Sequence, residues 1–256
     1  MTSLWRVALW GRGDDVELLR ARLLALAPSG IEELDTDDGV ELAAYLGDAG
    51  VERALAVFPD AAVAPVEQGW EDRWREFHHA VVVGGLWIGP PWEQPPDPSS
   101  AVVIDPGRAF GTGAHPTTRL CVALLASTAA RGSLLDVGCG SGVLAIAAAR
   151  IGFWPVLAVD VDPVAVDATL ANAIANDVVV EAAVVDALTD ALPRADVAVA
   201  NVLIRPVEAI LGRLDVREAI TSGYLAGERP AHPGWELVEV LEGDGWAADR
   251  FRRSGD

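Results

Sequence analysis

The sequence of 256 residues contains no lysine, so arginine supplies all 19 of its basic side chains. Aspartate and glutamate together number 38, and the formal net charge is −19 at pH 7. Nucleic-acid binding depends on basic side chains that contact phosphates, and this excess of acid argues against it. An acidic surface attracts a basic partner and speeds the encounter with it. Solubility alone explains the acidity equally well.

Cysteine, histidine and long apolar runs are also scarce. The two cysteines, Cys121 and Cys139, are too few for a disulfide framework and favour a reducing compartment. The four histidines do not stand at metal-ligand spacing, and no G-x-S-x-G nucleophile motif occurs. No run of about 18 apolar residues free of charges is present, and the N-terminus lacks the pattern of a signal peptide. We therefore expect a soluble cytoplasmic protein that binds neither a metal nor a membrane.

Residues 1–64 and 65–100 are predicted to precede the main domain. The first segment shows a strand, a helix, two strands joined by a turn and a second helix, which predicts a small α+β domain. The second segment is a predicted connector, in which a short helix over Gln68–Phe77 is followed by five prolines that keep the chain extended. That helix carries Trp70 and Trp74 one turn apart. Packing on a neighbouring domain is the usual role of such a pair, and gripping a substrate is the alternative.

Residues 101–256 alternate strands with helices, which predicts βαβ units and a parallel sheet covered on both faces. Two further strands, Glu236–Leu241 and Trp246–Arg252, predict an antiparallel hairpin at the sheet edge. The parallel strands are expected at Ser133–Val137, Val156–Asp160, Val178–Val185 and Ala195–Ala200, with helices at Gly142–Ile151, Pro163–Asn176 and Arg205–Leu214.

The segment Asp136–Gly142, with the sequence D-V-G-C-G-S-G, lies where a predicted strand gives way to a helix. Ligands of parallel α/β sheets bind at the carboxyl ends of strands. Gly138 and Gly140 allow the backbone to approach a ligand closely, and the N-terminus of the following helix suits an anionic group. Val143 stands where a dinucleotide-binding loop has its third glycine, which weakens a nicotinamide interpretation without excluding it. The pattern predicts a nucleoside-cofactor loop, and a tight structural turn is the alternative.

Acidic residues follow the next two predicted strands. Asp160 ends the strand after the glycine-rich loop, where a carboxylate accepts hydrogen bonds from ribose hydroxyls. Asp162 precedes Pro163 and suits the N-cap of the following helix, a role that is also the alternative for Asp160. Asp186 follows the third strand, where the edge of an adenine can be bound.

The stretch Asp105–Thr118 combines glycines, hydroxyls and a histidine in a pattern that excludes a helix or a regular strand. We expect a loop that closes over a ligand. Thr117 and Thr118 stand at the start of the following helix, and either could cap it. His115 alone is more often structural than catalytic. Asn201 ends the fourth strand on the same side of the sheet, where its amide can orient an amine or simply cap the strand.

Together these segments resemble the ribosomal protein L11 methyltransferase family. The family loop D-P-G-x-A-F-G-T-G-x-H-x-T-T is present from Asp105 to Thr118. The glycine-rich loop, the acidic pair within Asp160–Pro163 and the Ala-Asn-x-Leu strand end at Asn201 follow in the family's order. The connector with its Trp-x-x-x-Trp pair is also similar. The resemblance is strongest from 101 to 205 and faint in 1–64.

The resemblance implies a class I methyltransferase fold, which is Rossmann-like. Its features are a mostly parallel seven-stranded sheet, a C-terminal antiparallel hairpin and a small N-terminal α+β domain that recognises the substrate. It also implies an enzyme that transfers methyl groups from S-adenosyl-L-methionine to lysine side chains and an α-amine of ribosomal protein L11. We expect a monomer that contacts no nucleic acid directly.

The resemblance carries site residues over position by position. Thr118, Gly138, Asp160 and Asn201 would contact S-adenosyl-L-methionine, and Thr117 would lie beside them. To these we add Asp136 and Gly140 from the glycine-rich loop and Asp186 from the third strand end, and Asn201 is also the candidate catalytic residue that orients the amine.

Two departures from the family leave the methyl acceptor open. Leu214–Arg217 replaces a Gly-Gly turn, and the short segment Ala226–Gly234 replaces a helix. Both lie in the half of the fold that faces the substrate. The alternatives to L11 are another protein, a small-molecule acceptor, or binding of S-adenosylmethionine without catalysis.

Overall fold

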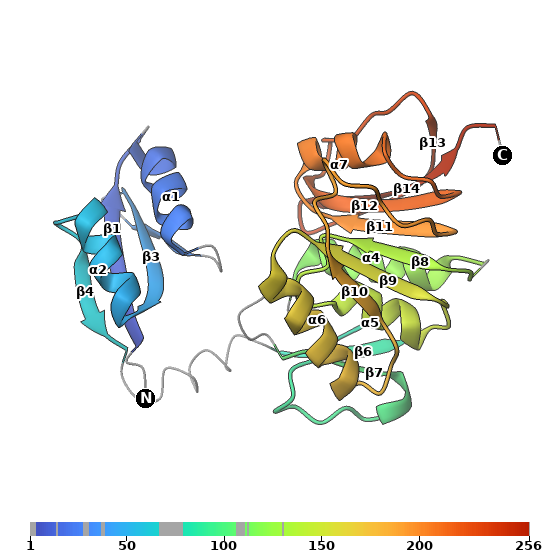
Figure 1. The fold of residues 1–256 in the computed structure, drawn as a ribbon, viewed down its shortest axis with the longest axis horizontal. Helices are drawn as coiled ribbons and strands as arrows, with labels where there is room; N and C mark the ends of the chain where they lie inside the picture. Colours follow the sequence, from blue (N-terminus) through green and yellow to red (C-terminus); the bar gives the residue numbers. More distant parts are fainter. Residues whose placement is uncertain are drawn as a thin grey trace. The chain divides into compact units, whose positions relative to one another are not determined.

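The structure is a computed structural model (Figure 1). The chain forms two compact units, which consist of residues 1–77 and 78–256. The predicted helix Gln68–Phe77, with Trp70 and Trp74, lies outside the described residues, as do residues 106–110 and 112 of the predicted ligand loop. The described residues are 4–13, 15–27, 31–36, 39–66, 79–105, 111, 113–129 and 131–255.

The described residues of the N-terminal unit form a four-stranded antiparallel sheet in the order β2-β3-β1-β4 and two helices. The predicted order of strands and helices is confirmed. A further strand, β4, adds four residues that end at a proline on the sheet edge, where a missing N–H is tolerated. The elements are β1 (Leu4–Gly11), α1 (Asp15–Leu26), β2 (Glu32–Thr36), β3 (Gly39–Gly47), α2 (Asp48–Val57) and β4 (Ala62–Pro65).

A small three-stranded sheet opens the second unit. It consists of β5 (Val81–Val83), β6 (Leu86–Gly89) and β7 (Ala101–Val103), with the short 3₁₀ helix η1 (Pro98–Ser100) before β7. The sequence predicts a connector without strands over 65–100. The strands β5 and β6 within this range are therefore a difference from the prediction. Short apolar runs give no reliable periodicity, and β6, whose four residues are all buried, is a strand through its pairing with β5 and β7.

The main sheet has seven strands in the order β10-β9-β8-β11-β12-β14-β13. The first five strands in this order, β10, β9, β8, β11 and β12, are parallel. Strand β14 pairs antiparallel with both β12 and β13. This confirms the predicted parallel sheet with a C-terminal hairpin. The strands are β8 (Leu134–Val137), β9 (Val156–Asp160), β10 (Glu181–Val184), β11 (Val197–Asn201), β12 (Glu218–Leu225), β13 (Trp235–Gly243) and β14 (Trp246–Arg253).

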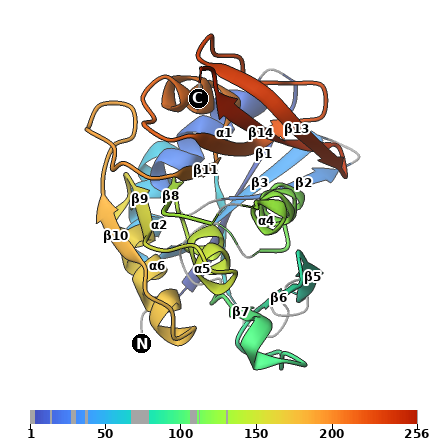
Figure 2. The same ribbon diagram turned by 90° about the vertical axis from the view of Figure 1, so that its right-hand side faces the viewer.

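Helices cover both faces of this sheet. Three of them pack on one face around residues such as Leu134, and the fourth packs on the other around Leu135, because successive residues of a strand point to opposite faces. Figure 2 shows α5 between α4 and α6, with the small sheet beside α4 and α5. The helices are α4 (Pro116–Ser127), α5 (Val143–Arg150) and α6 (Pro163–Ala175) on the first face, and α7 (Ile204–Leu211) on the second.

Cys121 and Cys139 are both free and buried, as expected from the lack of a disulfide framework. Within the described ranges, no helix has the length and apolar character needed to cross a bilayer. No group of three or more potential metal ligands occurs among the described residues.

Candidate active site

The glycine-rich loop turns the chain from β8 into α5 through three left-handed residues. Gly138, Gly140 and Gly142 have φ angles of 76°, 54° and 81°. A Cβ at Gly138 would lie 2.6 Å from Val202 Cγ1, and one at Gly142 would lie 2.8 Å from the Thr169 side chain. Glycine is therefore required at both ends of the loop by conformation and by close packing.

Two side chains form hydrogen bonds with the backbone of Gly140. The Asp160 carboxylate accepts from the Gly140 N–H at 3.0 Å, and the Thr169 hydroxyl donates to the Gly140 carbonyl at 3.1 Å. Asp160 also accepts from the backbone N–H of Asp162 at 3.0 Å. Asp162 itself accepts from the Val164 N–H at 2.9 Å and is the N-cap of α6, which assigns the predicted cap to Asp162.

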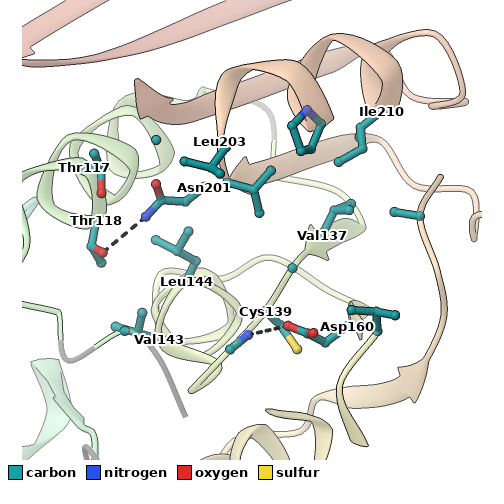
Figure 3. Close-up of a pocket in the computed structure, with 18 of the residues that line it drawn as sticks. Thr117, Thr118, Val137, Cys139, Val143, Leu144, Asp160, Asn201, Leu203 and Ile210 are labelled. Atoms are coloured by element: carbon teal, nitrogen blue, oxygen red, sulfur yellow. Dashed lines mark hydrogen bonds between the residues drawn. The ribbon is translucent and has the colours of Figure 1, made fainter. Parts of the chain in front are cut away.

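A cavity of about 760 Å³ opens at the carboxyl ends of the parallel strands (Figure 3). It lies at the sheet edge where ligands of α/β folds bind. Apart from the predicted site residues, most of the side chains that line the cavity are apolar, for example Val137, Leu144 and Ile210. Seven of the eight predicted site residues line the cavity, namely Thr117, Thr118, Gly138, Gly140, Asp160, Asp186 and Asn201, and their roles toward a ligand stay predictions.

Asp136 is the predicted site residue that does not line the cavity. Its side chain is buried behind the loop, where one oxygen accepts from the Ala145 N–H of α5 at 3.0 Å. The other oxygen has no hydrogen-bond partner among the described residues. Burial raises the pKa of this carboxyl to about 7, and the nearby Asp160 charge adds to the rise. Asp136 lies on the face of β8 that α5 covers, and its hydrogen bond to Ala145 stabilises the start of α5.

His115 caps α4, so the alternative role of Thr117 and Thr118, as caps of this helix, is wrong. Its Nδ1 atom accepts from the Thr117 N–H at 3.4 Å and lies 2.8 Å from the Thr117 hydroxyl. Burial and the neighbouring Arg119 charge lower the pKa of His115, so the imidazole is neutral at neutral pH. Because proline stands at the first helical position, the residue before it is the cap. Histidine is not among the preferred N-cap residues, so the sequence alone does not indicate this role.

Asn201 and Thr118 join the end of β11 to the start of α4. The Asn201 amide nitrogen donates to the Thr118 hydroxyl at 3.3 Å (Figure 3). The amide carbonyl is therefore the end of the Asn201 side chain that suits an incoming N–H group.

Sequence analysis did not place Trp246 or Gly223 in the site, although both line the cavity. The Trp246 ring lies edge-on to His115, with centroids 4.9 Å apart. At Gly223 the pairing of β12 with β14 shifts by one residue, and a Cβ would lie 2.1 Å from the Val202 carbonyl oxygen. An isolated glycine within a strand pattern is a sequence signal of such a bulge, but our predicted strands do not include residue 223.

Comparison with known proteins places this geometry in a family. The family model of ribosomal protein L11 methyltransferase matches residues 49–253, which is most of the chain. The chain belongs to the ribosomal protein L11 methyltransferase family. Among its relatives, the L11 methyltransferase of Dechloromonas aromatica is 43% identical over 181 residues, which are 69% of this chain and 60% of that protein. The L11 methyltransferase of Shewanella frigidimarina is 39% identical over 198 residues, which are 73% and 63% of the two chains.

This family member spans about 60% of the length of the curated relatives that it matches. A solved structure, the ribosomal protein L11 methylase from Lactobacillus delbrueckii subsp. bulgaricus, is 28% identical with a TM-score of 0.61. That comparison covers 68% of this chain and 98% of the other. The likeness and the strand order together establish the class I methyltransferase fold that the sequence predicted.

Proposed function

We propose that this chain transfers methyl groups from S-adenosyl-L-methionine to amino groups of ribosomal protein L11. These amino groups are lysine side chains, an α-amine, or both. The observation that carries the proposal is the cavity at the carboxyl ends of β8, β9 and β11 in a chain of this family. The glycine loop, Asp160 and Asn201 face this one cavity.

The lining residues fit S-adenosyl-L-methionine in shape and charge. The left-handed glycines leave room for a ligand against the backbone, and the N-terminus of α5 suits its carboxylate. Asp160 stands at the end of β9, where a carboxylate accepts from ribose hydroxyls, and Asp186 lies beyond β10 for the adenine edge. Asp160 and Asp186 are the acidic residues among the described lining residues, which include no arginine, so a positively charged sulfonium is favoured.

The residues of this chain orient the amine that accepts the methyl group. S-Adenosyl-L-methionine, when bound, supplies an electrophilic methyl group to an uncharged amine. Asn201, held by Thr118, presents its amide carbonyl to an N–H of the acceptor. The apolar side chains of Leu203, Ile210 and Trp246 also line the cavity, and an apolar lining favours the uncharged form of an amine.

We further propose that residues 1–64 recognise the protein substrate, 65–100 connect, and 101–256 carry out the transfer. The acidic charge of −19 suits a basic acceptor protein. A small-molecule acceptor and cofactor binding without catalysis are the alternatives.

The acceptor is tested by incubating the purified protein with L11 and radiolabelled S-adenosyl-L-methionine. We expect label on L11. Because the chain contains no lysine, label on a protein cannot come from its own lysine side chains. Label found only in small molecules of a cell extract would favour the small-molecule alternative. Cofactor binding without any transfer would favour a non-catalytic protein.

The cofactor site is tested by the pair Asp160→Asn and Asp162→Asn. Both substitutions remove one negative charge, but only Asp160 lines the cavity, and asparagine remains a good N-cap at 162. We expect Asp160→Asn to weaken S-adenosyl-L-methionine binding by about tenfold or more, since hydrogen bonds to a charged group are lost. Equal affinities of the two variants in calorimetric titration would refute the placement of the ribose at Asp160.

A further inference from the structure

Helix α6 and its C-cap residue, Asn176, carry three buried polar side chains on one face. Thr169, Asn172 and Asn176 follow one another at helical spacings of three and four, and each is at most 4% exposed. Such burial is unfavourable unless every polar group has a partner. We call these three residues the α6 polar face.

Asn172 bridges two segments that are far apart in the sequence. Its amide nitrogen donates to the Ser141 carbonyl of the glycine loop at 2.9 Å. Its amide oxygen accepts from the Asp105 N–H, just after β7, at 3.1 Å. One buried side chain therefore fixes the glycine loop relative to the chain that leaves β7.

Asn176 binds only the β7 side of this arrangement. Its amide oxygen accepts from the Val103 N–H at 2.7 Å, and its amide nitrogen donates to the Val103 carbonyl at 2.6 Å. The same nitrogen also donates to the Asn172 carbonyl within α6 at 2.8 Å. Asn176 thus completes the hydrogen bonding of β7 without a recorded bond to the glycine loop.

Ser141 extends the bridge to Gly111. Its hydroxyl donates to the Gly111 carbonyl, while its own carbonyl accepts from Asn172. Gly111 accepts one of these bonds, and Gly140 precedes Ser141 in the chain. Both glycines line the cavity, whereas Asn172 does not. A shift of Ser141 would therefore move two parts of the cavity wall.

We propose that Asn172 is a positioning residue for methyl transfer, which fixes the glycine loop from behind through Ser141. The proposal rests on the proposed function for its consequence in cofactor binding. Its structural part, the restraint on the loop, does not depend on any ligand.

The test compares Asn172→Asp with Asn176→Asp, which are equal changes on the same buried face. Asn172→Asp keeps an oxygen for the Asp105 N–H and replaces the donor to Ser141 by an oxygen. We expect hydrogen exchange of the amides of residues 138–142 to rise about tenfold in the unliganded protein, with a similar loss of S-adenosyl-L-methionine affinity. Asn176→Asp should raise exchange at residues 101–103 and leave cofactor affinity within about twofold.

Equal effects of the two variants on residues 138–142 would overturn the proposal, because Asn172 would then only stabilise α6. If Asn172→Asp does not fold, Asn172→Ala removes both bonds without a new oxygen and should raise exchange in the same loop. An unchanged loop in that variant would also overturn the proposal. Absence of S-adenosyl-L-methionine binding by the unsubstituted protein would refute the proposed function, and the exchange data would still decide the role of Asn172.

Discussion

Asp136 has one buried carboxylate oxygen bonded to the α5 backbone and one without a partner among the described residues. Desolvation raises its pKa from 3.8 to about 7. Between these values the folded protein keeps a proton that the unfolded chain has released. The contribution of Asp136 to the free energy of unfolding therefore falls as the pH rises from about 4 to about 7.

Asp136→Asn should remove this pH dependence, because the amide keeps an oxygen for the Ala145 N–H and cannot ionise. Relative to the parent, we expect the variant to gain about 2–3 kcal/mol of stability between about pH 5 and about pH 8. Urea unfolding at both pH values measures this. Parallel stability profiles of parent and variant would contradict the raised pKa.

The site residues that sequence predicts are those set by local rules. Gly138, Asp160 and Asn201 stand at the ends of parallel strands, and such ends meet at one edge of the sheet whatever the rest of the chain does. The orientation of Asp136 depends on the face that each residue of β8 presents, which buried strands do not reveal by alternation. Trp246 comes from a hairpin far along the chain, so only the folded sheet brings it to the cavity.

At the scale of elements, the bulge at Gly223 sets the position of the cavity wall. Gly223 has a φ of 101°, and a Cβ there would lie 2.1 Å from the Val202 carbonyl oxygen. Because that atom belongs to the backbone, a side chain at 223 must displace the segment that follows β11.

Gly223→Ala should therefore destabilise the protein by about 2–4 kcal/mol and weaken cofactor binding. Gly227→Ala is the matched control, since Gly227 has a φ of 93° but nothing within 4 Å of the added Cβ. Its cost should be the backbone strain alone, about 1 kcal/mol. Denaturant unfolding of the two variants gives the comparison, and equal costs would show that Val202 yields without penalty.

The elements that the sequence predicts differ in length and pattern from those that it does not predict. α6 begins with Asp162 and Pro163, two local signals that define a helix start, and its start was placed correctly. β4 and β6 have four residues each, and β5 has three. Strands this short are formed by their neighbours in space, which the sequence alone does not supply.

At the scale of the whole molecule, each unit has its own hydrophobic core. The two core clusters of the second unit draw their residues from position 81 onward, and the cluster of the first unit lies within residues 7–63. A unit with its own core can fold alone.

Residues 79–256 should therefore bind S-adenosyl-L-methionine with the affinity of the full chain, because all described cavity residues lie in this range. We expect methylation of L11 by this fragment to fall by about tenfold or more in kcat/KM, since the proposed recognition unit is missing. Calorimetry and labelled transfer measure the two properties on one preparation. Undiminished methylation would show that residues 1–64 do not recognise the substrate.

The position of β14 between β12 and β13 has a consequence for synthesis of the protein. Both neighbours leave the ribosome before β14, yet they do not pair with each other. A nascent chain that ends at Gly243 holds two strands that lack the partner between them, and it lacks the indole of Trp246 at the cavity. The lining of the cavity is thus completed only when β14, which begins at Trp246, has been made.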